Sequence, residues 1–277
     1  MSRYRLFIVL AALGLPALAC DRGTPPPSAA VEAPPPPIET ELAQGSRLIE
    51  PRVQELMHRM SDRLAQVSAL AIEAEEVYDN VPADRPRTQL TSTRRVAMRR
   101  PDRLVTDTSG DAYNRSLWYD GRTAASLDRE QNVWTSGAVP PTVDGALDWV
   151  FDRTGTVVPL ADFLYADVYD RMMSQVQRGV YLGVHEAAGV PCHHLSFEQA
   201  TIDWQLWIDA GPDPLPRKLV IAYKTEDEVP QYAVTIRKWN VAADLPDGLF
   251  RFVPPAGAKR VEIAAFTGEG EGDRRER

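Results

Sequence analysis

The chain has 277 residues, 44% of them hydrophobic and 25% charged, which is typical of a soluble globular protein with one large domain or two small ones. Its net charge of −8 at pH 7 argues against a general nucleic-acid binder, whose affinity comes from phosphates neutralised by Lys and Arg. Six Trp and nine Tyr supply aromatic area for a core or an apolar cavity.

Residues 1–19 are predicted to be a signal peptide. Arg3 and Arg5 form a positive start, and the uncharged stretch Leu6–Ala19 is shorter than the about 20 residues of a comfortable membrane span. It ends in Ala-Leu-Ala before Cys20, which resembles the lipobox of bacterial lipoproteins with its usual order swapped. The same tripeptide is also a site for ordinary signal peptidase. We favour lipidation of Cys20, which would tether the protein to the inner or outer membrane on its periplasmic side.

Residues 20–45 are predicted to be a disordered leash that follows the lipidated cysteine. Residues 21–45 contain seven prolines and no apolar periodicity, so they cannot bury enough surface to offset the loss of chain entropy. Extended, such a segment spans roughly 75 Å. If Cys20 is acylated, Cys192 is the only thiol left and no intramolecular disulfide forms; ordinary cleavage would leave two cysteines that could pair.

The remaining chain alternates between helical and strand patterns. Apolar residues recur at helical spacing over 48–67, and strand-like segments follow at 70–77, 88–100, 103–108, 116–119, 123–128 and 133–137. Two helical blocks occupy 142–177, with Pro159 at the start of the second. Strands resume at 180–186, 192–199, 202–209, 217–224 and 231–240, and 266–277 is predicted to be a disordered tail.

These elements predict one α+β domain over residues 46–265. About ten antiparallel strands would form a curved, half-open β-barrel, because a sheet of this size curls. The helices over 48–67 and 142–177 would cover its concave face.

Several runs in this order resemble a known family of predicted periplasmic proteins, domain of unknown function 2092. The runs include RPDRL at 100–104, DWQLWI at 203–208, PLPRKL at 214–219 and FRFVPPAGA at 250–258. That family is similar in turn to the outer-membrane lipoprotein carrier (LolA/LolB-like) superfamily. The resemblance implies a half-open β-barrel closed by helices, with an apolar cavity that holds acyl chains. It implies a fold more than a function, because the family's own activity is not established.

The residue pattern gives little support for catalysis or metal binding. His193 and His194 are neighbours on a predicted strand, so their side chains point to opposite faces, and His58 and His185 lie in separate elements. Cys192 and His194 share a strand face, but nothing marks an oxyanion hole beside them. We therefore predict no enzyme, no metal site and no cofactor.

A basic stretch, Arg94, Arg95, Arg99, Arg100 and Arg103, has two interpretations. Its charges could meet anionic lipid headgroups, or they could line a solvated strand edge, where positive charge discourages aggregation. We favour the solvated edge.

The leading hypothesis is a lipid-anchored, non-catalytic periplasmic protein that binds an acyl chain, a lipid or a lipoprotein beneath a movable cover at 142–177. The alternative is a structural lipoprotein whose half-barrel is filled by its own side chains and docks an envelope protein. Trp204 and Trp207 lie three residues apart, so only one of them should face the concave interior. The candidate cavity residues are Leu147, Val150, Leu160, Phe163, Leu164, Trp204 and Trp207.

Overall fold

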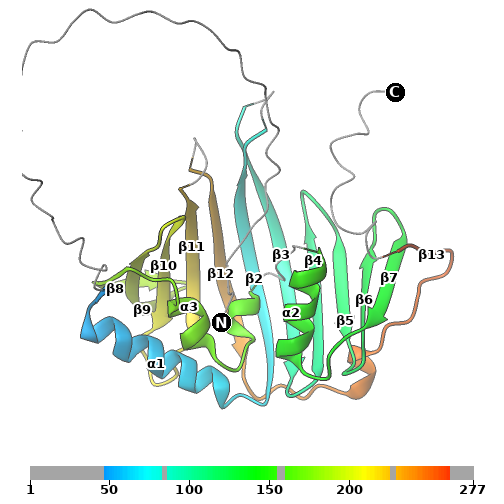
Figure 1. The fold of residues 1–277 in the computed structure, drawn as a ribbon, viewed down its shortest axis with the longest axis horizontal. Coiled ribbons are helices and arrows are strands. Elements are labelled where there is room, and N and C mark those ends of the chain that lie inside the picture. The colour runs from blue at the N-terminus through cyan, green and yellow to red at the C-terminus, as the bar shows by residue number, and fades with distance from the viewer. Residues whose placement is uncertain (1–46, 83–85, 155–159, 225–228, 263–277) are drawn as a thin grey trace, which may run out of the picture.

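The structure is a computed structural model that describes residues 47–82, 86–154, 160–224 and 229–262 (Figure 1). The predicted signal peptide, Cys20, the leash over 20–45 and the tail over 266–277 lie outside the described residues. So does Pro159, the predicted start of the second helical block.

Thirteen strands among the described residues form one open sheet in the order β1-β8-β9-β10-β11-β12-β2-β3-β4-β5-β6-β7-β13. The eleven strands from β8 to β7 in this order pair antiparallel, and β12 beside β2 joins the two halves of the chain. Two short strands, β1 (Leu48–Ile49) and β13 (Lys259–Arg260), pair parallel at the edges. The long strands are β2 (Ala69–Asn80), β3 (Thr88–Arg99), β4 (Arg103–Gly110), β5 (Arg115–Tyr119), β6 (Thr123–Asp128), β7 (Val133–Ala138), β8 (Arg178–Ala187), β9 (Val190–Glu198), β10 (Ile202–Asp209), β11 (Pro216–Tyr223) and β12 (Gln231–Asn240). The prediction of about ten antiparallel strands was close, and the two parallel edge strands were missed.

The first helix, α1 (Pro51–Ala65), is shorter at both ends than the predicted 48–67. Glu50 has extended backbone (φ −60°, ψ 139°), which a residue before proline favours, and Pro51 suits the first helical position because it has no N–H to leave unbonded. Leu48 and Ile49 therefore pair with the start of β8 instead of entering the helix.

One sheet face, here called the helix face, carries α1, α2 (Val143–Thr154), the short 3₁₀ helix η1 (Ala161–Phe163) and α3 (Val168–Met173) (Figure 1). The opposite side is called the outer face. Alternate strand residues, such as Phe197 on β9 and Trp204 on β10, join the helices in one buried apolar cluster. The stripe that α1 contributes is 0% exposed and consists of Val53, Leu56, Met57, Met60 and Leu64. No helix among the described residues is long and apolar enough to cross a membrane.

The second predicted helical block does not form one helix. Leu160 has a left-handed backbone (φ 63°), which no residue adopts inside a right-handed helix. The chain therefore restarts as η1 and then α3, and the loop between them lets Phe163, Leu164 and Val168 all turn into the core.

The C-terminal FRFVPP run, residues 250–255, packs against the outer face. Phe250, in the 3₁₀ helix η2 (Asp247–Phe250), is 1% exposed, with the Arg99 guanidinium 5.5 Å from its ring centroid. Phe252 contacts Trp118 and Trp134 at centroid distances of 5.0 and 5.4 Å. This run therefore has a structural role outside the helix face.

Candidate functional site

The described residues from α2 to α3, 143–154 and 160–173, are here called the cover. Four predicted cavity residues on it belong to the main buried cluster: Leu147, Leu160, Phe163 and Leu164, which are 3%, 6%, 1% and 0% exposed. Val150 is half-buried against the same cluster.

The two candidate tryptophans of β10 lie on opposite faces. Trp204, 4% exposed, joins the cover residues in the main cluster, whereas Trp207 packs with Cys192 and Ala187 in a second cluster on the outer face. Trp204 therefore lies on the helix face, in the same cluster as the cover residues, and Trp207 lies on the outer face.

The cover is attached firmly at the first turn of α2. The Val143 amide donates to the Pro101 carbonyl at 2.8 Å, and the Tyr119 hydroxyl donates to the Pro140 carbonyl at 2.7 Å. The second half of the helix is different, because large side chains there, Trp149 and Phe151, are only half-buried.

Arg171 of α3 holds the rest of the cover together. Its guanidinium contacts Asp148 at 3.2 Å and Asp167 at 3.0 Å, and it stacks 3.3 Å from the Tyr165 ring centroid. Burial raises the pKa of Tyr165 well above its ordinary value. Burial also raises the pKa of Asp162 in η1 to about 6, against the opposing attraction of Arg171.

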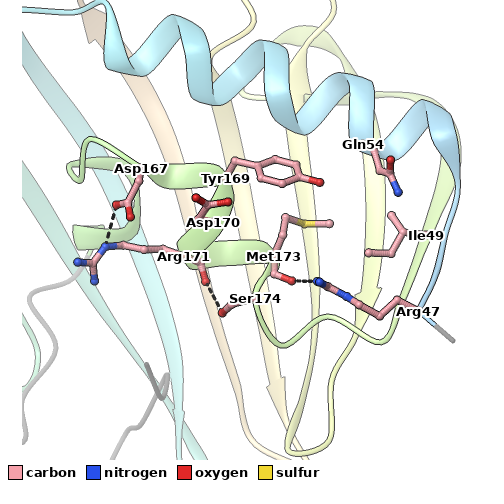
Figure 2. A pocket seen from close by; sticks show the side chains of 9 residues that line it. All are labelled: Arg47, Ile49, Gln54, Asp167, Tyr169, Asp170, Arg171, Met173 and Ser174. Carbon is pink, nitrogen blue, oxygen red and sulfur yellow. Dashed lines mark hydrogen bonds and ion pairs between the residues drawn. The ribbon is translucent and has the colours of Figure 1, made fainter. Parts of the chain in front are cut away.

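A pocket of about 480 Å³ opens between the start of α1 and α3 (Figure 2). Arg47 reaches across it, and its guanidinium donates to the backbone carbonyls of Met173 and, at 2.9 Å, Val176. Most of the residues that line it have polar or charged side chains, and none is a predicted cavity residue, so this pocket is not the apolar cavity that the resemblance implies. The residues that line the pocket are Arg47, Ile49, Gln54, Asp167, Tyr169, Asp170, Arg171, Met173 and Ser174.

Part of the helix face is polar, which the sequence did not predict. Glu76 of β2 and Arg94 of β3, each 2% exposed, form a two-pronged ion pair at 2.8 and 3.0 Å. Ser92 and Tyr232 also donate to Glu76, at 2.8 and 2.7 Å. Burial by itself would lower the pKa of Arg94, but the hydrogen bonds and charge of Glu76 raise it overall. Burial also raises the pKa of Tyr232.

The α2 helix begins at the turn between β3 and β4, where the Val143 amide donates to the Pro101 carbonyl. Figure 1 draws it in front of these two strands. The helix face thus combines a large apolar cluster with the polar cluster around Glu76 and Arg94.

The predicted solvated edge of arginines is wrong, because β3 lies inside the sheet between β2 and β4. Arg94 is buried against Glu76, and the other side chains are largely bonded within the protein. Arg99 bonds Asp247 and the Leu245 carbonyl, Arg100 bonds the Tyr165 carbonyl at 3.0 Å, and Arg103 pairs with Asp102 at 2.9 Å.

Histidines that the sequence placed in separate elements meet on the outer face. His185 of β8 and His194 of β9 approach to 2.9 Å between their Nδ1 atoms, and His194 Nε2 lies 2.9 Å from Gln205 Oε1. His193 points to the other face, as alternation predicts, and contacts the Tyr181 hydroxyl. The described residues contain no group of three or more His, Cys, Asp or Glu side chains arranged to hold a metal ion.

The possible thiol–imidazole pair of Cys192 and His194 does not form. The Cys192 thiol points to the Val190 and Ala187 carbonyls, at 3.4 and 3.8 Å. Burial raises its pKa to about 11, so the sulfur stays protonated and is a poor nucleophile near neutral pH.

The comparisons with known proteins concern most of the folded chain. The family described as "Predicted periplasmic protein (DUF2092)" matches residues 53–264. A comparison with curated protein sequences gave no match. Among solved structures, an uncharacterized conserved protein from Thermus thermophilus is 10% identical, with a TM-score of 0.45 and coverage of 76% of this chain and 98% of that one. The lipoprotein LppX of Mycobacterium tuberculosis is 9% identical (TM-score 0.38; coverage 71% and 100%), and a LolA superfamily protein from Nitrosomonas europaea is 8% identical (TM-score 0.34; coverage 72% and 97%).

Proposed function

This chain belongs to the DUF2092 family of predicted periplasmic proteins, and we propose that it is a membrane-anchored lipoprotein whose half-barrel binds a hydrophobic ligand without catalysing a reaction. The ligand is an acyl chain, a lipid or a lipid-modified protein. Residues 1–19 are the signal peptide, the lipid on Cys20 is the anchor, residues 20–45 are the leash, and residues 46–265 form the binding domain.

The observation that carries this proposal is the uneven attachment of the cover. Its apolar side chains occupy the helix face, yet the second half of α2 is only half-buried around Trp149 and Phe151. A ligand would enter by displacing Leu147, Phe163 and Leu164 from the sheet.

The free-energy cost of displacing these side chains is comparable to the gain from burying an acyl chain in their place. Moving a buried Leu or Phe side chain into water costs about 1.5–3 kcal/mol, so exposing three of them costs about 5–9 kcal/mol. An acyl chain gains about 0.8 kcal/mol for each CH₂ group buried, so about ten groups offset that cost. A ligand of ordinary fatty-acid length is therefore sufficient.

The alternative is a self-filled scaffold that docks an envelope protein. The near-complete burial of Phe163 and Leu164 favours it, because a core packed to native density leaves no room for a ligand. Both hypotheses use the same residues and differ in whether the cover moves.

The test compares Phe163→Ala with Phe250→Ala in the purified full chain. Both phenylalanines are 1% exposed, so each substitution should cost about 3–5 kcal/mol of stability. Only Phe163→Ala removes a side chain that competes with the ligand, so it should tighten binding of methyl laurate, measured by saturable quenching of tryptophan fluorescence, by about fivefold or more. Phe250→Ala, on the outer face, should leave the affinity unchanged.

Native mass spectrometry of the same preparations supplies an independent measurement. The proposal expects lipid to co-purify with the wild-type chain. Absence of bound lipid, together with no saturable quenching in the wild type or in Phe163→Ala, would establish the self-filled scaffold instead.

A further inference from the structure

Trp204 carries a buried hydrogen-bond donor that has no acceptor. Its side chain is 4% exposed, and its indole Nε1 has no hydrogen-bond partner among the described residues. Trp239, by contrast, donates its indole N–H to the Pro216 carbonyl at 2.8 Å. Buried donors in native proteins are almost always bonded, so an unbonded one calls for a specific explanation.

The surroundings of Trp204 explain why the protein does not satisfy this donor itself. On the helix face its neighbours across the strands are Phe197, whose ring is stacked 3.8 Å away, and Ile221. The same row continues to Gly179 on one side and Tyr232 on the other. Among these five residues no side chain is charged, and the one hydroxyl, that of Tyr232, donates to Glu76.

The donor also lies on the helix face, where the proposed ligand would bind. Trp204 belongs to the same buried cluster as Phe163 and Leu164 of the cover, and as Met173 of α3. Displacing the cover would therefore present a ligand with an apolar, aromatic surface that contains one fixed N–H group.

We propose that Trp204 recognises the carbonyl of a neutral, ester-linked acyl chain, an inference that rests on the proposed function. An indole N–H only donates, so its partner must be an acceptor, which a plain hydrocarbon lacks. A free carboxylate is a poor fit, because burying a charge requires a counter-charge, and the buried cation of the helix face, Arg94, lies on β3, beyond β11, β12 and β2, and is already paired with Glu76. A neutral ester supplies the acceptor without the charge.

The experiment compares two ligands of similar length, methyl laurate and tetradecane, in competition with bound N-phenyl-1-naphthylamine on the full chain. Trp204→Phe keeps an aromatic ring and removes the N–H. It should weaken methyl laurate binding about five- to tenfold, as expected for one hydrogen bond, and change tetradecane binding less than about twofold. Trp239→Phe, which removes an indole already bonded within the protein, should not discriminate between the two ligands.

A second measurement follows the indole N–H resonance of Trp204 in the wild-type chain and uses the variant only to assign that resonance. In the ¹⁵N-tryptophan-labelled wild-type chain, the Trp204 indole resonance is identified by its absence from the Trp204→Phe spectrum. Methyl laurate should move this N–H resonance downfield, whereas tetradecane should not, because only the ester forms the hydrogen bond.

The outcomes separate the two proposals. If the wild type binds neither ligand, the proposed function is refuted and the ester inference with it. If both ligands bind, but Trp204→Phe weakens both equally or neither, and the indole resonance responds alike to both, ligand binding stands and recognition of an ester is refuted.

Discussion

Asp162 should make the cover less stable at neutral pH than in acid. This carboxyl group lies in η1, beside the buried Phe163, and burial raises its pKa from the ordinary 3.8 to about 6 despite the attraction of Arg171. Tyr165, Asp148 and Asp167 are further titratable groups around Arg171, and Tyr165 stays neutral because its pKa is also raised.

The sign of the pH dependence follows from proton binding. Between about pH 4 and pH 6 the folded protein holds a proton on Asp162 that the unfolded chain has released, so acid favours the folded state. This stability is fully present below the unfolded pKa and is lost as pH rises through the folded pKa. Each unit of pKa difference between the folded and unfolded states is worth 1.36 kcal/mol. The free energy of unfolding should therefore change by about 3 kcal/mol over this pH range.

Asp162→Asn tests this reasoning, because an amide stays neutral at every pH. We expect the variant to exceed the wild type by up to about 3 kcal/mol in free energy of unfolding at pH 7 and to equal it near pH 4. Urea titrations followed by tryptophan fluorescence at pH 4, 5, 6 and 7 measure the difference. Asp152→Asn, at an exposed position on α2, is the matched control for loss of one negative charge.

The reasoning fails if Asp162→Asn and the wild type differ by the same amount at all four pH values, or if the variant is less stable at pH 7. Either result would mean that the ionised carboxylate is well solvated or well bonded in the folded protein. If the expected result is found, ionised Asp162 destabilises the folded protein at neutral pH.

Two further predictions concern the anchor and the polar cluster. Cys20→Ser should release the protein from membranes as a soluble periplasmic species and abolish incorporation of labelled palmitate; a wild type that never takes up the label would refute lipidation. Arg94→Met should cost about 3–5 kcal/mol in urea unfolding, because it leaves Glu76 charged and buried, and adding Glu76→Met should recover more than half of that loss. A cost below about 1 kcal/mol for the single substitution would mean that water reaches the pair.

Local patterns in the sequence were sufficient to predict most of the elements. The predicted bounds of β6, β10 and β12 match the structure, because alternation of apolar residues and flanking turn residues act within a few positions of each other. The same alternation places Trp204 and Trp207 on opposite faces of β10, as the structure has them. Which of the two would face the helices could not be decided, since alternation does not say which side of a sheet becomes the core.

Only the tertiary structure decided which residues meet. Glu76 accepts a hydrogen bond from Tyr232, 156 residues away in the sequence. The two residues meet because β2 pairs with β12 and is not an edge strand. That pairing puts β2 inside the sheet, and β3 lies between β2 and β4, so Arg94 is a buried partner of Glu76 and not the predicted surface charge. The sequence by itself determined the antiparallel strands, the first helix and two distinct faces, because these depend on short-range periodicity. Strand order, the polar cluster of the helix face and the unbonded N–H of Trp204 depend on contacts between distant segments, and no periodicity encodes those.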